Sequence, residues 1–479
     1  MKYSILYVDI LCGGLKSKMP VQIPGSTAFN PAMQGCRVIS GRFPAHTTSS
    51  LGGKISTIFL SFADFESRNN HNTFSGLSQV FTEMVRKRSD VRFMVMMNCN
   101  TEGPQGSRKT YIKREQIIAH LKAEGIDPSN IDITFVDCKF KKMYSGLYLY
   151  LRDIFVFGND STIILPAKFR HLSIPCDISM LKNEIDMLAD TLGLKVVVSD
   201  LVFEGGDILF TDNLQFICIN TILSNIEGIP TREKIEAVKK RFEEYFGRKA
   251  VIVWTGKPER IDDDPLFHVD MFLTPLGRNE VLLPDPELGF DMLTSLPGKA
   301  FEEAHQKIHE ERKKLVREGL LDSALIENPQ EDEEKWSIAH CCTGLLAANS
   351  EFKDPNSFYY KEIKGLSKDL GLNLKIIENN LRMQGITVAG RLPFLYLWTF
   401  RHAFTYHNML LEDYTDISGK RIRRALLGIS GITIIDDYVA DVIRSRDFEA
   451  VPISGAYELL GIESGGGGLH CVTNEIRPS

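Results

Sequence analysis

The stretches GDILF (206–210), QFICIN (215–220), REKIEAVKKRFEEYF (232–246) and AVIVW (250–254) follow one another closely and decide the predicted fold. The first two runs are short, apolar and separated by a brief loop, which predicts a pair of strands. The third run repeats apolar residues at helical spacing between charged ones and predicts an amphipathic helix. The fourth is rich in β-branched residues and predicts a strand. Together they predict a strand–strand–helix–strand unit.

The same order of elements recurs along the chain at a spacing of roughly 50–60 residues, which indicates a repeat architecture. Further strands are predicted at 55–62, 91–97, 131–136, 147–157, 162–165, 194–198, 268–274, 280–283, 393–399, 404–411, 450–453 and around Cys471, and further helices at 77–85, 112–124, 179–192 and 436–446. Short strand pairs between longer crossovers favour a cyclic α/β array over an open doubly wound sheet. A mixed α/β sheet with hairpin edges is the alternative, because it would show the same alternation.

Two segments depart from this pattern. Residues 1–53 are rich in Gly, Pro and Ser and are expected to form an irregular N-terminal extension. Residues from about 287 to 370 contain a charged helical run (301–318) and an acidic stretch (328–335), which predict a helical insertion. One catalytic domain, 54–479, interrupted by this insertion, is therefore expected.

Composition excludes several classes of partner. The chain has 479 residues, 25% of them charged, and a net charge of −6, so it lacks the basic footprint of a nucleic-acid-binding protein. No run of about 18 apolar residues predicts a membrane span. The first twelve residues include Asp9 and do not resemble a cleavable signal, so a cytoplasmic location is expected, with signal-less secretion as the alternative.

The nine cysteines do not indicate a disulfide framework or a metal site. They are scattered, and the only clustered pair, Cys341 and Cys342, lacks the C-x₂-C spacing of a zinc site. Reduced thiols are therefore expected, with no metal and no cofactor. Cys99, Cys138 and Cys218 lie in apolar runs and are interpreted as inert core residues.

Four segments place polar residues at predicted strand ends in aromatic or Gly-rich settings: YLRD (150–153), FEGGD (203–207), FHVD (267–270) and GGLHC (467–471). Strand ends of successive repeats converge on the axis of a closed array. The candidate residues Asp153, Glu204, His268, Asp270 and Cys471 could therefore share one pocket. Each also has a structural interpretation: Asp153 as a buried partner of Arg152, Glu204 as a turn residue, and the last three as core groups.

Cys471 has the strongest local case for chemistry. Four glycines, 465–468, precede the motif and let the backbone pass close to a bound substrate. Strand alternation would turn His470 to the opposite face, so His268 is the preferred catalytic imidazole. His268 and Asp270 lie two residues apart and would share one face of a strand.

The four segments, in this order, resemble the guanidine-modifying (pentein) superfamily, which includes arginine, agmatine and peptidylarginine deiminases and amidinotransferases. RD followed by FV resembles the first acidic motif, EGGD and HVD resemble the second and third, and GGGGLHCVTN resembles the nucleophile motif of the agmatine and peptidylarginine enzymes. YHN (406–408) resembles the stretch before the last repeat of agmatine deiminases. The resemblance implies a five-bladed α/β propeller of strand–strand–helix–strand (ββαβ) repeats.

The resemblance also implies roles for these residues. Asp153 and Asp270 would hold the guanidinium through charge-assisted hydrogen bonds. The Cys471 thiolate would attack its central carbon, and His268 would protonate the leaving amine and then activate water. Glu204 would orient His268 or hold the guanidinium. A further substrate-binding role falls to Asn408.

A deiminase acting on arginine in a protein or peptide is the expected activity, because the unfamiliar insertion favours a macromolecular substrate and offers a surface for a protein partner. Agmatine and free arginine are the alternatives; free arginine would need a cation for its carboxylate, for which Arg170 and Lys168 are candidates. An amidinotransferase would use the same intermediate with an amine acceptor. A non-catalytic scaffold protein is a rival from another class, and so is a generic Cys–His hydrolase, which would leave Asp153 and Asp270 unexplained.

Overall fold

The computed structural model describes residues 49–62, 71–98, 112–138, 151–158, 162–169, 185–186, 188–190, 192–255, 268–318, 353–396, 403–456 and 468–477. Several predictions fall outside these residues: the N-terminal extension up to 48, Arg170, the acidic stretch 328–335, glycines 465–467 and most of the helix predicted at 179–192. The described residues form a mixed α/β structure with five small sheets.

Each of the five sheets contains an antiparallel strand pair followed by a parallel pair. The first has the order β17-β1-β2-β3, with β17 Thr473–Ile476, β1 Thr57–Ser61, β2 Arg92–Asn98 and β3 Ile133–Cys138. The second and third are β4 Val156–Gly158, β5 Thr162–Leu165 and β6 Lys195–Val198, and β7 Ile208–Phe210, β8 Leu214–Cys218 and β9 Lys249–Val253. The fourth is β10 Thr274–Gly277, β11 Glu280–Asp285, β12 Thr387–Tyr396 and β13 Ala403–Thr405; the fifth is β14 Leu410–Thr415, β15 Arg421–Gly428 and β16 Glu449–Ile453.

Amphipathic helices make the crossovers between the parallel strands. They include α2 (His71–Lys87), α7 (Arg232–Phe246) and α14 (Thr433–Arg444), with α6 (Ile219–Ser224) before α7 and α3 (Arg114–Ala123) between β2 and β3. Helix α7 begins where the Thr231 side chain accepts a hydrogen bond from the backbone N–H of Lys234, and it ends at Gly247 in a left-handed conformation. It buries its apolar face, including Phe242 and Phe246, against the third sheet. The local sequence therefore determines both the limits and the packing of this helix.

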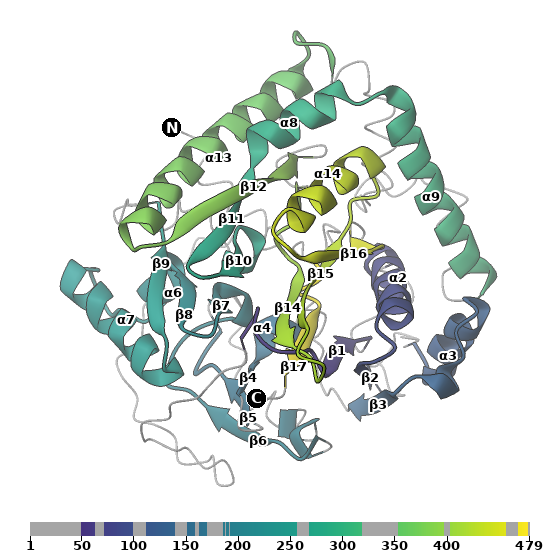
Figure 1. The fold of residues 1–479 in the computed structure, drawn as a ribbon, viewed down its shortest axis with the longest axis horizontal. Coiled ribbons are helices and arrows are strands. Elements are labelled where there is room, and N and C mark those ends of the chain that lie inside the picture. The colour runs from purple at the N-terminus through teal and green to yellow at the C-terminus, as the bar shows by residue number, and fades with distance from the viewer. Residues whose placement is uncertain are drawn as a thin grey trace, which may run out of the picture.

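Among the described residues between β11 and β12 are three helices: α8 (Pro286–Ser295), α9 (Gly298–Arg317) and α13 (Phe358–Met383). Helix α8 packs so closely on β12 that a Cβ at Gly289 would lie 2.1 Å from the carbonyl oxygen of Phe394. Helix α13 contributes to the same hydrophobic core as β11 and β12, and the expected insertion boundary at about 370 falls inside it. Helix α9 runs along the outside of the molecule toward α3 (Figure 1).

The last strand of the chain joins the first sheet. β17 pairs antiparallel with β1, and Figure 1 shows the sheets following one another around the middle of the molecule. A buried ion pair links the first sheet region to the fifth: the Arg88 guanidinium lies 2.9 Å from Glu412 on β14, and Glu412 also accepts a hydrogen bond from the backbone N–H of Ile55. The first and last described strands thus share one sheet, and the ion pair connects its surroundings to the fifth sheet.

Local structure differs from the sequence prediction where the candidate residues lie. Asp153 was predicted in a strand but lies in the short helix α4 (Leu151–Ile154). His268 and Asp270 were also predicted in a strand, but His268 precedes a 3₁₀ helix, η4 (Val269–Met271), that contains Asp270. Cys471 lies in a turn two residues before β17. Short buried apolar runs look alike as strands or as single helical turns, which is why these predictions were wrong.

Strand β15 was not predicted; its arginine-rich first half masks the apolar second half, which is the buried part. Within the described parts of the chain, no helix is long and apolar enough to cross a membrane.

Candidate active site

The Cys471 thiol is held by Asn408 from the loop before β14. The Asn408 amide donates from Nδ2 to Sγ at 3.0 Å, and its Oδ1 accepts from the backbone N–H of Cys471 at 3.0 Å. Both groups are buried, at 3% exposure each. A Cβ on Gly468 would lie 2.6 Å from Asn408 Oδ1, so only glycine fits there. The glycine before the thiol therefore allows this close approach.

The imidazole of His268 lies among three carboxylates. Its Nε2 is 3.0 Å from Glu204 Oε2 and 3.9 Å from Asp207, and its Nδ1 is 3.7 Å from Asp153 Oδ1. A hydrogen bond also joins it to the Cys471 thiol. The structure thus brings together the imidazole, the thiol and two of the predicted carboxylates.

The segment EGGD (204–207) positions this group. The backbone N–H of Glu204 donates to Asp207 across the 3₁₀ helix η2 (Gly205–Asp207), and the N–H of Gly206 donates to Asp153 Oδ1 at 3.1 Å. A Cβ at Gly206 would lie 2.6 Å from His268 Nδ1. The two glycines are therefore required by the close approach of α4 and His268.

Asp270 contacts both the thiol and a second histidine. Its Oδ2 is 2.9 Å from Nδ1 of His470 and 3.6 Å from Cys471 Sγ. Its Oδ1 is buried and has no hydrogen-bond partner among the residues that the structure describes. Strand alternation was expected to turn His470 away from Cys471, but both contact the same carboxylate oxygen, because they lie in a turn and not in a strand.

Burial and charge shift the titration of these groups. Burial, followed by the charges of Glu204, Asp270 and Asp207, raises the pKa of Asp153 to about 7 against the opposing effect of His268. Burial alone would lower the pKa of His268, but the charge of Asp153 and the hydrogen bonds to Cys471 and Glu204 raise it well above its ordinary value. Burial and the charge of Asp270 raise the pKa of Cys471 to about 12. At neutral pH these shifts favour a protonated Cys471 thiol beside a His268 imidazolium.

Two groups of side chains have metal-ligand character in the described structure. One is Glu204, Asp207 and His268 in the site itself; the other is His120, Glu124 and Glu318 between α3 and α9. In the second group Glu124 already pairs with the cations Lys314 and Arg86. These contacts occupy the carboxylate that a metal would use.

Each of the six residues predicted for the site contacts another member of the set, which consists of Asp153, Glu204, His268, Asp270, Asn408 and Cys471. Lys168, a candidate for binding a carboxylate, has an exposed side chain and forms a β-bridge with Val202. The described structure does not join it to these six residues. Sequence reasoning overlooked Asp207 and Met271. Asp207 could have been found as the last residue of EGGD, whereas Met271, whose sulfur is 3.9 Å from Cys471 Sγ, has no recognisable signal.

No protein-family model and no curated protein sequence matches the chain. Similar folds occur among solved structures. An X-ray structure of a protein provisionally assigned as an agmatine deiminase has a TM-score of 0.51 at 13% identity, over 91% of this chain and 96% of that one. The agmatine deiminase of C. jejuni gives 0.49 at 12% identity over 90% and 96%, and that of Enterococcus faecalis gives 0.47 at 12% over 92% and 99%.

At these identities the likeness concerns the fold alone. It rests on the first of these structures, whose TM-score is 0.51. The mixed α/β structure with five small sheets agrees with the expected fold class, and the similar structure agrees with the motifs, which resemble the guanidine-modifying (pentein) superfamily close to agmatine and peptidylarginine deiminases. The comparison confirms this resemblance at the level of fold.

Proposed function

We propose that the chain is a guanidine-group hydrolase, a deiminase, in which Cys471 attacks the central carbon of a guanidinium. The observation that supports this most strongly is the convergence of one thiol, one raised-pKa imidazole and the carboxylates of Asp153 and Asp270 in one buried site. A buried cluster with excess negative charge attracts a planar cation whose N–H groups pair with carboxylates. A generic Cys–His hydrolase would not need these two carboxylates.

Substrate binding would itself activate the thiol. The high pKa of Cys471 results from burial and from the charge of Asp270. A guanidinium beside Asp153 and Asp270 neutralises that charge, favours the ionised form of Asp153 and lowers the pKa of the thiol. The thiolate is then stabilised by the His268 imidazolium and by the amide N–H of Asn408.

In the first half-reaction, Sγ of Cys471 forms a bond to the guanidinium carbon, and one C–N bond breaks. His268 gives its proton to the departing nitrogen, so ammonia leaves and a covalent thiouronium remains. In the second half-reaction, neutral His268 takes a proton from water, whose oxygen bonds to the same carbon. The C–S bond then breaks, returning the thiolate and releasing a neutral ureido product, while the proton of the added hydroxyl passes to solvent, where it protonates the released ammonia.

Glu204 supports this cycle through His268. Its Oε2 lies 3.0 Å from Nε2, which orients the ring and stabilises the imidazolium. We place Glu204 as a positioning residue, and Asn408 as the donor to the thiolate with a further contact to substrate.

We also infer that the five sheets are the blades of a closed propeller with the site near its axis. The pairing of β17 with β1 supports closure, since the last strand of the chain completes the first sheet. Closure would explain why residues from five different parts of the sequence meet.

For the substrate, the comparison favours agmatine, because that is the guanidine named for the protein of similar fold. Protein arginine, favoured by the helices between β11 and β12, is the second candidate. Ammonia and ureido product should be measured with agmatine, free arginine and an arginine-containing protein, beside Cys471→Ala and with or without glycine. Product from one substrate in wild type alone supports the proposal. Equal product formation by the wild-type enzyme and by Cys471→Ala on all three substrates contradicts the proposal. A guanidino product that forms only with glycine would identify an amidinotransferase instead.

A further inference from the structure

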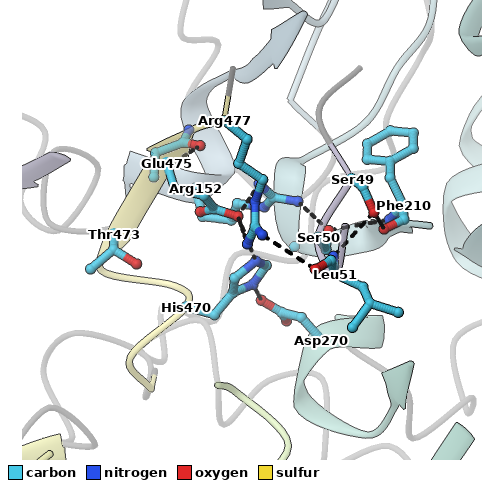
Figure 2. Close-up of polar contacts among 12 residues, drawn as sticks. Ser49, Ser50, Leu51, Arg152, Phe210, Asp270, His470, Thr473, Glu475 and Arg477 are labelled. Atoms are coloured by element: carbon cyan, nitrogen blue, oxygen red, sulfur yellow. Dashed lines mark hydrogen bonds and ion pairs between the residues drawn. The ribbon is translucent and has the colours of Figure 1, made fainter. Parts of the chain in front are cut away.

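A buried polar network contacts Asp270 through His470. His470 is 97% buried, with Nδ1 at 2.9 Å from Asp270 Oδ2. Because an ionised carboxylate only accepts hydrogen bonds, Nδ1 of His470 must carry the proton. Figure 2 shows His470 between Asp270 on one side and Glu475 and Arg477 on the other.

Glu475 lies near the Nε2 atom of His470 and is itself paired with two arginines. Glu475 Oε1 lies 3.9 Å from His470 Nε2, 4.0 Å from Arg152 and 3.5 Å from Arg477. Burial alone would raise the pKa of Glu475, but the charges of Arg152, His470 and Arg477 lower it. Glu475 is therefore an ionised group at the centre of the network.

The network is tied to a segment from the start of the described chain. Arg477 Nη1 donates to the carbonyl oxygens of Leu51, Gly52 and Gly53, and Arg152 donates to the Ser50 hydroxyl at 3.3 Å (Figure 2). Arg152 also donates its backbone N–H to the carbonyl oxygen of Cys471. Through Arg152 and Glu475, these contacts hold the turn that contains His470 and Cys471.

We infer that His470 is a positioning residue that holds the Asp270 carboxylate with Oδ1 directed at the guanidinium, an inference that rests on the proposed function. His470 occupies Oδ2 and leaves Oδ1 without a hydrogen-bond partner among the described residues. It also competes with the thiol for Oδ2, which lies 3.6 Å from Sγ. Without His470 the carboxylate is free to rotate and to accept the thiol proton, which weakens cation binding and keeps the sulfur protonated.

The test compares two reagents that alkylate Cys471, 2-chloroacetamidine and 2-chloroacetamide. They have similar shapes, but only the amidine is a cation with guanidinium-like N–H groups. The rate ratio of amidine to amide, followed by mass spectrometry, reports the carboxylate site without requiring turnover. A merely structural defect lowers both rates together and leaves the ratio unchanged.

Three variants separate the outcomes. His470→Leu removes the donor, His470→Gln moves an amide donor one carbon further out, and His470→Asn keeps an N–H near the Nδ1 position. We expect the ratio to fall on the order of tenfold in the Leu and Gln variants and to stay within about threefold of wild type in the Asn variant. His120→Leu, which removes a buried imidazole outside the site, serves as the matched control and keeps the ratio.

A wild-type preference for the amidine that survives in both His470→Leu and His470→Gln overturns the inference alone. If His470→Leu does not fold, the comparison of His470→Gln with His470→Asn decides. Absence of any amidine preference in wild type contradicts the guanidinium site itself, and with it both the proposed function and this inference.

Discussion

Asn408 is hydrogen-bonded to Cys471 at two points, through its Nδ2 to Sγ and through its Oδ1 to the backbone N–H, each at 3.0 Å. The pairing connects two residues that are 63 positions apart, and it fixes the thiol relative to the loop before β14. A donor at this distance stabilises a thiolate more than a thiol, because hydrogen bonds to charged groups are the stronger ones.

Asn408→Ala should therefore lower kcat/KM by about 10- to 150-fold, corresponding to about 1.5–3 kcal/mol for a hydrogen bond to a charged group. Steady-state deiminase kinetics checks this, with Asn408→Asp as the matched variant that keeps the shape but places a second negative charge at the sulfur. The Asp variant should be at least as impaired. Activity of Asn408→Ala within about threefold of wild type would show that the contact does not serve the thiolate.

The pH dependence of substrate binding should report Asp153. Its pKa of about 7 lies above the ordinary carboxyl range, so the group gains a proton as the pH falls through neutrality. A protonated carboxyl holds a guanidinium less well, so KM should rise below pH 7 by more than kcat falls. The measurement is KM and kcat from pH 5.5 to 8.5. A KM that stays constant across this range would contradict the assigned role of Asp153.

Removing the charge of Glu204 should move the alkaline limb of the activity profile. Glu204 and Asp207 both help to raise the pKa of His268, and Glu204 is the closer of the two. Glu204→Gln should therefore lower that pKa, so that activity requiring the imidazolium is lost at lower pH than in wild type. Asp207→Asn is the matched comparison and should shift the limb less. If the alkaline limb of Glu204→Gln stays at the wild-type pH, Glu204 does not raise the pKa of His268 in the working enzyme.

The Arg88–Glu412 pair should contribute to stability and not to chemistry. Both side chains are buried, and Glu412 also accepts from the backbone N–H of Ile55. Glu412→Ala leaves the buried Arg88 guanidinium paired with the half-exposed Asp90 and should reduce the free energy of unfolding by about 3 kcal/mol. Urea denaturation measures this. Asp441→Ala is the control, because the ion pair between Asp441 and Arg444 is exposed and should contribute less than about 1 kcal/mol. Similar losses in the two variants would contradict the account of the pair.

Much of the fold could be predicted from the sequence where periodicity is strong. Helix α7 occupies the predicted residues, because its apolar spacing, its N-cap Thr231 and its terminal Gly247 all agree. The strand pair of the third sheet was also located to within two residues, whereas the strands predicted at 147–157 and 268–274 overlap β4 and β10 only at their ends. Strand β15 was missed, because its exposed first half is dominated by arginines.

The residues of the site could be selected from the motifs, but their geometry could not be predicted. Asp153, His268 and Cys471 were all placed on strands, whereas each lies in or beside a short helix or turn. Tertiary contacts such as the N–H of Gly206 to Asp153 decide these conformations, and a local pattern contains no record of them. The same error directed His470 away from the site, although it contacts Asp270.

The central claim is covalent attack by Cys471 on a guanidinium carbon, and acid quenching followed by mass spectrometry tests it most directly. Enzyme mixed with the best guanidine substrate should show the Cys471 peptide heavier by the mass of the substrate less ammonia. Cys471→Ala should show neither the adduct nor ammonia release. Ammonia release by Cys471→Ala at the wild-type rate, with no adduct in either protein, would contradict the account.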